Sequence, residues 1–267
     1  MHPRLALNSL STASWPLEQE LELFVDLGVP RAGLFLDKLV AAGDDRAIQL
    51  VRDAGVAVTE VTCRGVTPSQ PERWSEDRAR LLHALEFARV FGAPFVSVTS
   101  GPAGTLSWEA AAAGLGEALA PVVAAASDDG VKVAIEQTLP IRPDVGFVHS
   151  LRDTVELARR FGLGAILEAH YCFAERGIED TVRSSADVVA VVQLSDLAPP
   201  CQAVLDRAVP GDGIIPLERL VRTLVESGYG GVFELEMLGP RVEAEGYACA
   251  CRRGVAHLDA VLTAAGA

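Results

Sequence analysis

The chain has 267 residues, of which 49% are hydrophobic and 22% charged, and its mean hydropathy is +0.26. This composition excludes an intrinsically disordered chain, a coiled coil and a small disulfide-bonded scaffold, and it indicates a globular protein. The 36 acidic and 23 basic side chains give a formal charge of −13, so the overall field repels nucleic-acid phosphates and anionic lipid. We therefore expect neither nucleic acid nor a membrane as a partner.

Short apolar runs alternate with helical stretches along the chain, which is typical of βα units around a parallel sheet. Most runs are continuously apolar, as expected for strands that are covered on both faces. The eight predicted strands are Leu5–Asn8, Ala32–Leu36, Ala57–Cys63, Phe95–Ser100, Val131–Glu136, Ala165–Glu168, Val188–Leu194 and Val232–Glu236.

The stretches between these runs carry helix signals. A helix is predicted over Leu17–Leu27, another over Arg73–Phe91, an alanine-rich helix after the cap Ser107, and a fourth over Pro216–Ser227. No linker rich in Ser, Gly or Pro divides the chain, so residues 1–267 are predicted to form a single (β/α)8 TIM barrel. The chemistry of such a barrel lies on the loops that follow the strands.

Three predicted strands end in a glutamate: the fifth at Glu136, the sixth at Glu168 and the eighth at Glu236. The seventh offers Gln193 near its end. In a barrel these side chains face the mouth, where a buried carboxylate needs a metal ion, a cationic side chain or water as its partner. Glu234 points the same way as Glu236 but lies one layer deeper, and it would need a partner of its own.

Three carboxylates and one amide oxygen form an oxygen-rich ligand set. We therefore expect Glu136, Glu168, Gln193 and Glu236 to hold one divalent metal ion. Mn²⁺ or Mg²⁺ suits this set best, with Co²⁺ or Zn²⁺ as alternatives. The competing interpretation is that each carboxylate pairs with an arginine or caps a helix, in a barrel that binds no metal.

Several segments resemble the sugar phosphate isomerase/epimerase family, the xylose isomerase-like TIM barrels. The most specific is Pro210-Gly211-Asp212-Gly213, followed by a helix and a Gly-Tyr-x-Gly strand. The segments that carry the resemblance are Ile135-Glu136, Leu167–His170, Val192–Asp196, Pro210–Pro216 and Gly228–Glu236.

The resemblance implies a barrel in which Glu136, Glu168, Gln193 and Glu236 bind one divalent ion, while the first and last of these also move protons. The chain departs from the family's pattern at two places. Glu168 stands where the family usually has Asp, with Tyr171 in place of the His three residues later, and Gln193 stands where the family usually has His. A longer carboxylate and a neutral amide should loosen the site and weaken its affinity for Zn²⁺.

The expected reaction is the isomerisation or epimerisation of a small polyhydroxylated carbonyl compound, a sugar or sugar phosphate. A carboxylate removes the proton alpha to the carbonyl, and a divalent ion stabilises the enediolate. Glu136 and Glu236 are the predicted acid/base pair, with His170 as a candidate second base. Arg207, in the long segment after the seventh strand, is a candidate clamp for substrate oxygens, and Trp108 a candidate apolar wall.

Two other functions fit the same residues. A lyase or dehydratase acting on a keto-polyol or an oxidised glycoside would begin with the same proton abstraction. A non-catalytic barrel would bind a small molecule without a metal. An endonuclease IV-like repair enzyme would need more metal-binding histidines and a basic face, which this sequence does not offer.

The chain is predicted to be cytoplasmic. Its first residues, Met1-His2-Pro3-Arg4, lack the pattern of a secretory signal, and no apolar run reaches the roughly 18 residues of a membrane helix. The five cysteines are odd in number and scattered, as expected for reduced thiols. The sequence leaves open whether the exposed helix faces assemble a homo-oligomer.

Overall fold

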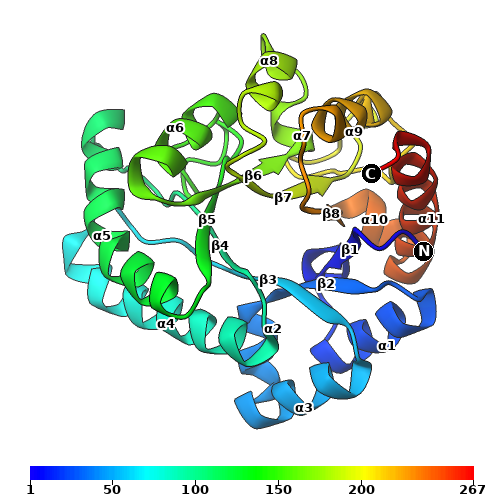
Figure 1. Ribbon diagram of the computed structural model, residues 1–267, viewed down its shortest axis with the longest axis horizontal. Coiled ribbons are helices and arrows are strands. Elements are labelled where there is room, and N and C mark those ends of the chain that lie inside the picture. The colour runs from blue at the N-terminus through cyan, green and yellow to red at the C-terminus, as the bar shows by residue number, and fades with distance from the viewer.

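The computed structural model describes residues 1–267, in which eight parallel strands form a closed barrel surrounded by helices (Figure 1). Each strand pairs with the next one along the chain, and β8 closes the barrel by pairing with β1. The predicted (β/α)8 TIM barrel is thereby confirmed. Its strands are β1 (Leu5–Asn8), β2 (Arg31–Phe35), β3 (Ala57–Cys63), β4 (Phe95–Thr99), β5 (Lys132–Glu136), β6 (Gly164–Glu168), β7 (Val189–Leu194) and β8 (Val232–Leu235).

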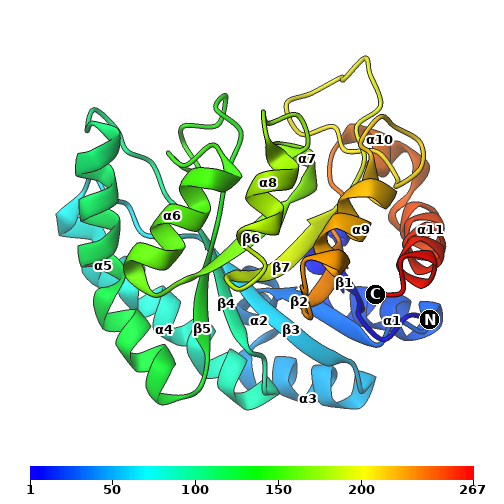
Figure 2. The same ribbon diagram turned by 45° about the horizontal axis from the view of Figure 1, so that its top comes forward.

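The helices pack around the strands, and Figure 2 shows the long connections after β5, β6 and β7 rising on one side of the barrel. Every predicted strand agrees with the structure to within one residue at each end. The helices are α1 (Leu17–Leu27), α2 (Leu36–Ala42), α3 (Asp44–Ala54), α4 (Trp74–Phe91), α5 (Trp108–Asp128), α6 (Leu151–Phe161), α7 (Ala169–Cys172), α8 (Ile178–Arg183), α9 (Leu217–Glu226), α10 (Pro240–Glu245) and α11 (Tyr247–Ala265).

Helix α5 is the exception to the expectation that no segment could cross a membrane. It is long enough and apolar enough to do so by length and composition alone. In the barrel it contacts α4, β5 and α6, and it buries a face that includes Leu115, Leu119 and Val122. The apolar residues of α5 thus form the face that packs against the rest of the barrel.

A layer of polar side chains fills the middle of the barrel. Glu60 and Glu234 are fully buried there; Asn8 Nδ2 donates to Glu234 Oε2 at 2.9 Å and to Glu60 Oε1 at 3.2 Å, while Thr59 donates to Glu234 and Ser97 to Glu60. Burial, followed by the charge of Glu234, raises the pKa of Glu60 well above its usual range. Sequence reasoning missed Glu60, although a charge in the middle of a strand covered on both faces must point into the barrel.

Gly33 on β2 makes room for this layer. A Cβ atom at this position would lie 2.6 Å from Glu234 Oε2 and 2.9 Å from Asn8 Nδ2, so one of these groups would have to move. Replacing Gly33 thus conflicts with two hydrogen-bonded side chains inside a closed barrel.

We predict that Gly33→Ala lowers the free energy of unfolding by about 1–3 kcal/mol, because overpacking disrupts the Asn8–Glu234 contact. Urea unfolding measures the change. The matched control is Gly230→Ala, where a Cβ meets nothing within 4 Å, and its stability should stay close to that of the wild type. Equal stability of the two variants would contradict the prediction.

Candidate metal and acid–base site

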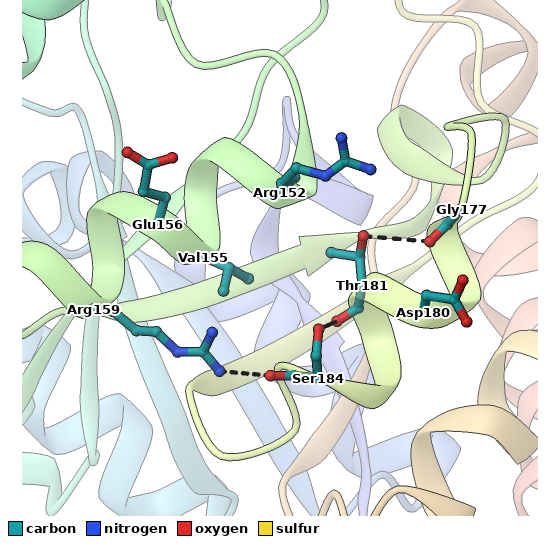
Figure 3. Close-up of a pocket in the computed structure, with 8 residues that line it drawn as sticks. All are labelled: Arg152, Val155, Glu156, Arg159, Gly177, Asp180, Thr181 and Ser184. Carbon is teal, nitrogen blue, oxygen red and sulfur yellow. Dashed lines mark hydrogen bonds between the residues drawn. The ribbon is translucent and has the colours of Figure 1, made fainter.

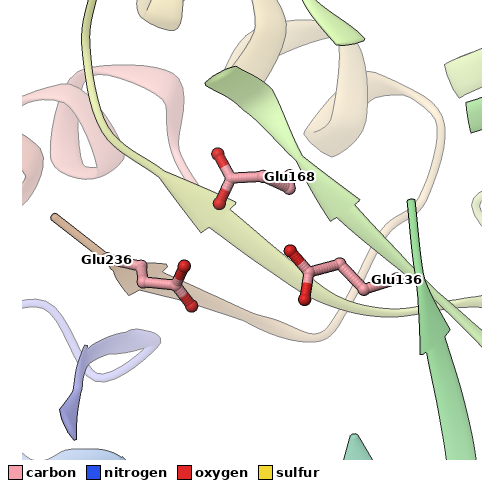
Figure 4. A group of neighbouring side chains, drawn as sticks. All are labelled: Glu136, Glu168 and Glu236. Carbon is pink, nitrogen blue, oxygen red and sulfur yellow. The ribbon is translucent and has the colours of Figure 1, made fainter. Parts of the chain in front are cut away.

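Three glutamates converge at the carboxyl ends of the strands. Glu136 is the last residue of β5, Glu168 is the last residue of β6, and Glu236 directly follows β8. One carboxylate oxygen from each lies within 4.8 Å of the others. Figure 4 shows the three side chains directed toward a common centre. The structure thus brings together three of the four ligands predicted for a metal ion.

Gln193 on β7 connects this cluster to the polar layer below. It is fully buried, and its backbone is in register with Glu168 on β6 and with Glu234 on β8. Its Nε2 donates to Glu60 Oε1 at 3.4 Å, while its Oε1 has no hydrogen-bond partner. The Gln193 amide is therefore held by Glu60 in the polar layer and keeps a free acceptor oxygen.

Arg207 supplies a cation to the cluster, and its side chain is only 1% exposed. Its Nη1 lies 2.6 Å from Glu236 Oε1 and 3.0 Å from Glu168 Oε2, and it also donates to the Glu236 carbonyl oxygen at 2.9 Å. The guanidinium lies over the ring of Tyr171, 5.1 Å from its centroid. The alternative that carboxylates pair with an arginine thus holds for Glu168 and Glu236, whereas Glu136 has no cation within 4.0 Å.

Burial sets the proton affinity of the cluster. Desolvation raises the pKa of Glu168 to about 8, even though Arg207 favours its charged form. The pKa of Glu136 is raised well above its usual range by burial and by repulsion from Glu236 and Glu168. Although burial disfavours its charge, the neighbouring acids keep the pKa of Arg207 raised. The cluster therefore retains at least one proton near neutral pH when its only cation is Arg207.

The loop between β7 and α9 carries Arg207, and Asp196 fixes this loop. The Asp196 carboxylate accepts hydrogen bonds from the backbone N–H groups of Leu197, Gly211, Gly213 and Ile215. A Cβ at Gly213 would lie 2.2 Å from Asp196 Oδ1, so the chain can wrap the carboxylate only with glycine there. The Pro-Gly-Asp-Gly motif thus holds the loop around a buried acid.

Two other predicted site residues lie near the mouth without hydrogen bonds from their side chains to the three glutamates. Burial, and then the charge of Arg207, lower the pKa of His170 to about 4, so its ring is neutral at physiological pH. Its Nδ1 is buried without a partner, while its backbone N–H donates to Glu168 at 2.8 Å. Trp108 begins α5 and packs edge-on against Phe147, with ring centroids 6.0 Å apart.

Glu168, Glu236 and Arg207 are buried in this structure, whereas Glu136 is half-buried and keeps some contact with solvent. A groove of about 510 Å³ lies elsewhere, between α6 and α8 on the outside of the barrel (Figure 3). Its lining includes Arg152, Arg159 and Asp180, and none of the predicted site residues. We therefore assign no part of the candidate site to this groove.

The oxygen atoms at the site fit a divalent metal ion as its ligands. Three buried acceptor oxygens at the site have no hydrogen-bond donor: Glu168 Oε2, Glu236 Oε2 and Gln193 Oε1. The contact of Arg207 with Glu168 is one of charge without hydrogen-bond alignment, so that oxygen keeps acceptor capacity. Together with Glu136, these atoms provide the hard oxygen ligands that Mg²⁺ and Mn²⁺ prefer.

Fold and site together define a class: a closed parallel barrel with an acidic candidate metal site at the carboxyl ends of its strands. The sequence profile described as xylose isomerase-like TIM barrel matches residues 22–259. The chain belongs to this family, and the resemblance seen in its sequence is confirmed. No curated protein matches the chain in sequence.

Solved structures share the fold across the whole chain. A zinc-bound IolI protein superposes with a TM-score of 0.85 at 17% identity, covering 98% of each chain. A xylose isomerase domain protein from Alicyclobacillus acidocaldarius gives 0.77 at 21% identity, covering 99% of each chain. D-Psicose 3-epimerase with D-tagatose from Clostridium cellulolyticum H10 gives 0.75 at 15% identity, covering 97% of this chain and 98% of its own.

The raised pKa of Glu168 predicts a dependence of stability on pH in metal-free protein. The unfolded carboxyl ionises near 4.5 and the folded one near 8, so the native state binds the extra proton between these values. Stability should therefore fall as pH rises through this window, by up to about 1.4 kcal/mol per pH unit for this one group. Urea unfolding in EDTA at pH 5, 6, 7 and 8 measures the slope.

The variant Glu168→Gln is the control for this slope. It cannot ionise, so its stability should fall less steeply over the same pH range. An identical slope in both proteins would show that Glu168 ionises normally in the folded state.

Proposed function

We propose that this protein is a metal-dependent isomerase or epimerase that acts on a small polyhydroxylated carbonyl compound, a sugar or sugar phosphate. The observation that supports this most strongly is the convergence of Glu136, Glu168 and Glu236 within 4.8 Å at the mouth of the barrel. Membership of the xylose isomerase-like family supports the same class of chemistry. The epimerases among the similar structures act on sugars, which agrees with this substrate class.

The residues that would hold the metal are Glu136, Glu168, Glu236 and, through its free Oε1, Gln193. A bound divalent ion would supply charge stabilisation for the oxygens of an enediolate. Mn²⁺ or Mg²⁺ suits the oxygen ligands best, because no imidazole or thiolate joins the set.

Glu136 and Glu236 would move the proton. They come from β5 and from the residue after β8, so their carboxyl groups reach the mouth from different strands. One carboxylate removes the proton alpha to the carbonyl, and the other returns a proton to the neighbouring carbon or to the opposite face. Arg207 would bind substrate oxygens, with Trp108 and His170 at the rim of the site.

The reaction is tested by incubating protein and Mn²⁺ with a panel of ketoses and keto-polyols in D₂O and recording NMR spectra. Isomerase or epimerase activity places deuterium on the carbon alpha to the carbonyl without loss of a substituent. Elimination with formation of water or an alcohol would instead identify a lyase that uses the same proton abstraction. Absence of both exchange and elimination across the panel would favour a non-catalytic binding barrel.

We predict that Glu136→Gln and Glu236→Gln each reduce deuterium exchange by about 10²–10⁴-fold, the usual contribution of a positioned acid or base. Exchange rates and elemental analysis of the purified variants measure the effect. The exposed Glu156 on α6 offers a control, because Glu156→Gln should exchange at the wild-type rate. Wild-type rates in the Glu136 and Glu236 variants would rule out their role as the acid/base pair.

A further inference from the structure

Arg207 contacts two of the carboxylates that a metal ion would need. Its Nη1 contacts Glu236 Oε1 at 2.6 Å and Glu168 Oε2 at 3.0 Å. Mg²⁺ and Mn²⁺ bind carboxylate oxygens at about 2.0–2.2 Å, so an ion that bridges Glu236 Oε1 and Glu168 Oε2 would lie close to the present position of Nη1. The two cations would also repel each other in a buried site, where charge is poorly screened. Guanidinium and metal therefore compete for the same two carboxylates.

The backbone that carries Arg207 is fixed by the fold. The Arg207 N–H donates to the Leu238 carbonyl at 3.1 Å, and the next residue, Ala208, exchanges two backbone hydrogen bonds with Asp196. The preceding Asp206 carboxylate is fixed by the Gln202 and Arg241 N–H groups. Because the backbone is held on both sides, only the side chain of Arg207 can leave the carboxylates.

The departures from the family's pattern match this arrangement. Glu168, longer than the usual aspartate, contacts the guanidinium, and Tyr171, in place of the usual histidine, provides the ring beneath it. The side chain of Gln193 adds no positive charge that would compete with Arg207. Glu168 and Tyr171 thus both contact the guanidinium of Arg207.

We propose that Arg207 is a tethered competitor of the metal ion. In metal-free protein its guanidinium contacts both Glu168 and Glu236; metal binding displaces the guanidinium, which then faces the mouth where substrate oxygens would arrive. This inference rests on the proposed function, because it concerns the same metal site. It adds that a metal ion must displace the guanidinium of Arg207 to bind, which lowers the affinity for the metal. It also adds that Arg207 reaches the substrate only in the metal-loaded protein.

The test compares Mn²⁺ binding to wild-type protein, Arg207→Met and Arg207→Lys by isothermal titration calorimetry at one pH. Arg207→Met removes the cation while keeping an apolar chain for packing, and it should bind Mn²⁺ at least about tenfold more tightly than wild type, within the usual range of coupling between two ligands. Arg207→Lys keeps a charge and should fall between the two. The control Arg241→Met removes a neighbouring arginine that holds the same loop without contacting the glutamates, and it should not tighten binding.

A crystal structure of wild-type protein with Mn²⁺, located by its anomalous signal, gives a second measurement that needs no variant. Nη1 should be more than 4 Å from both Glu168 and Glu236. Equal Mn²⁺ affinity in wild type and Arg207→Met, or Mn²⁺ bound with the Arg207 contacts unchanged, would overturn the competition and leave the proposed function standing. Failure of wild type and all variants to bind Mn²⁺, Mg²⁺, Co²⁺ or Zn²⁺ would overturn the metal-dependent function and the competition together.

Discussion

The structure depends on the way it compensates five glutamates inside one barrel. Glu60 and Glu234 lie in the middle layer, and Glu136, Glu168 and Glu236 lie at the mouth. Unpaired charges at such depth would cost far more free energy than a folded domain has to spare. The lower pair is compensated by donors from Asn8, Thr59 and Ser97, whereas the upper three depend on Arg207, on retained protons or on a metal ion.

The two layers are also connected. Gln193 donates its amide N–H to Glu60 below and leaves its carbonyl oxygen free. A change in the hydrogen bonds of the lower layer would therefore alter the direction in which that oxygen points. The candidate metal site at the mouth and the packing in the middle of the barrel are thus parts of one polar network that includes Glu60.

The sequence allowed the barrel, the strand bounds and the three converging glutamates to be predicted, because each glutamate ends a continuous apolar run. The contacts of Arg207 were not predictable, since they depend on the path of a long loop and on Asp196 binding four backbone N–H groups across that loop. Glu60 was missed because it interrupts a strand and does not end it. His170 was predicted as a candidate second base, but its burial, which lowers its pKa, follows only from the packed structure.

The anchoring of the β7–α9 loop has a consequence for which parts of the loop can vary in sequence. Residues 206–210 are buried and hydrogen-bonded, whereas residues 199–204 are exposed. The loop is thus divided into a fixed base, which carries Arg207, and a tip that can vary in sequence and length at little cost to folding. Such a division lets the exposed tip of the loop evolve independently of the base that holds Arg207 against the glutamates.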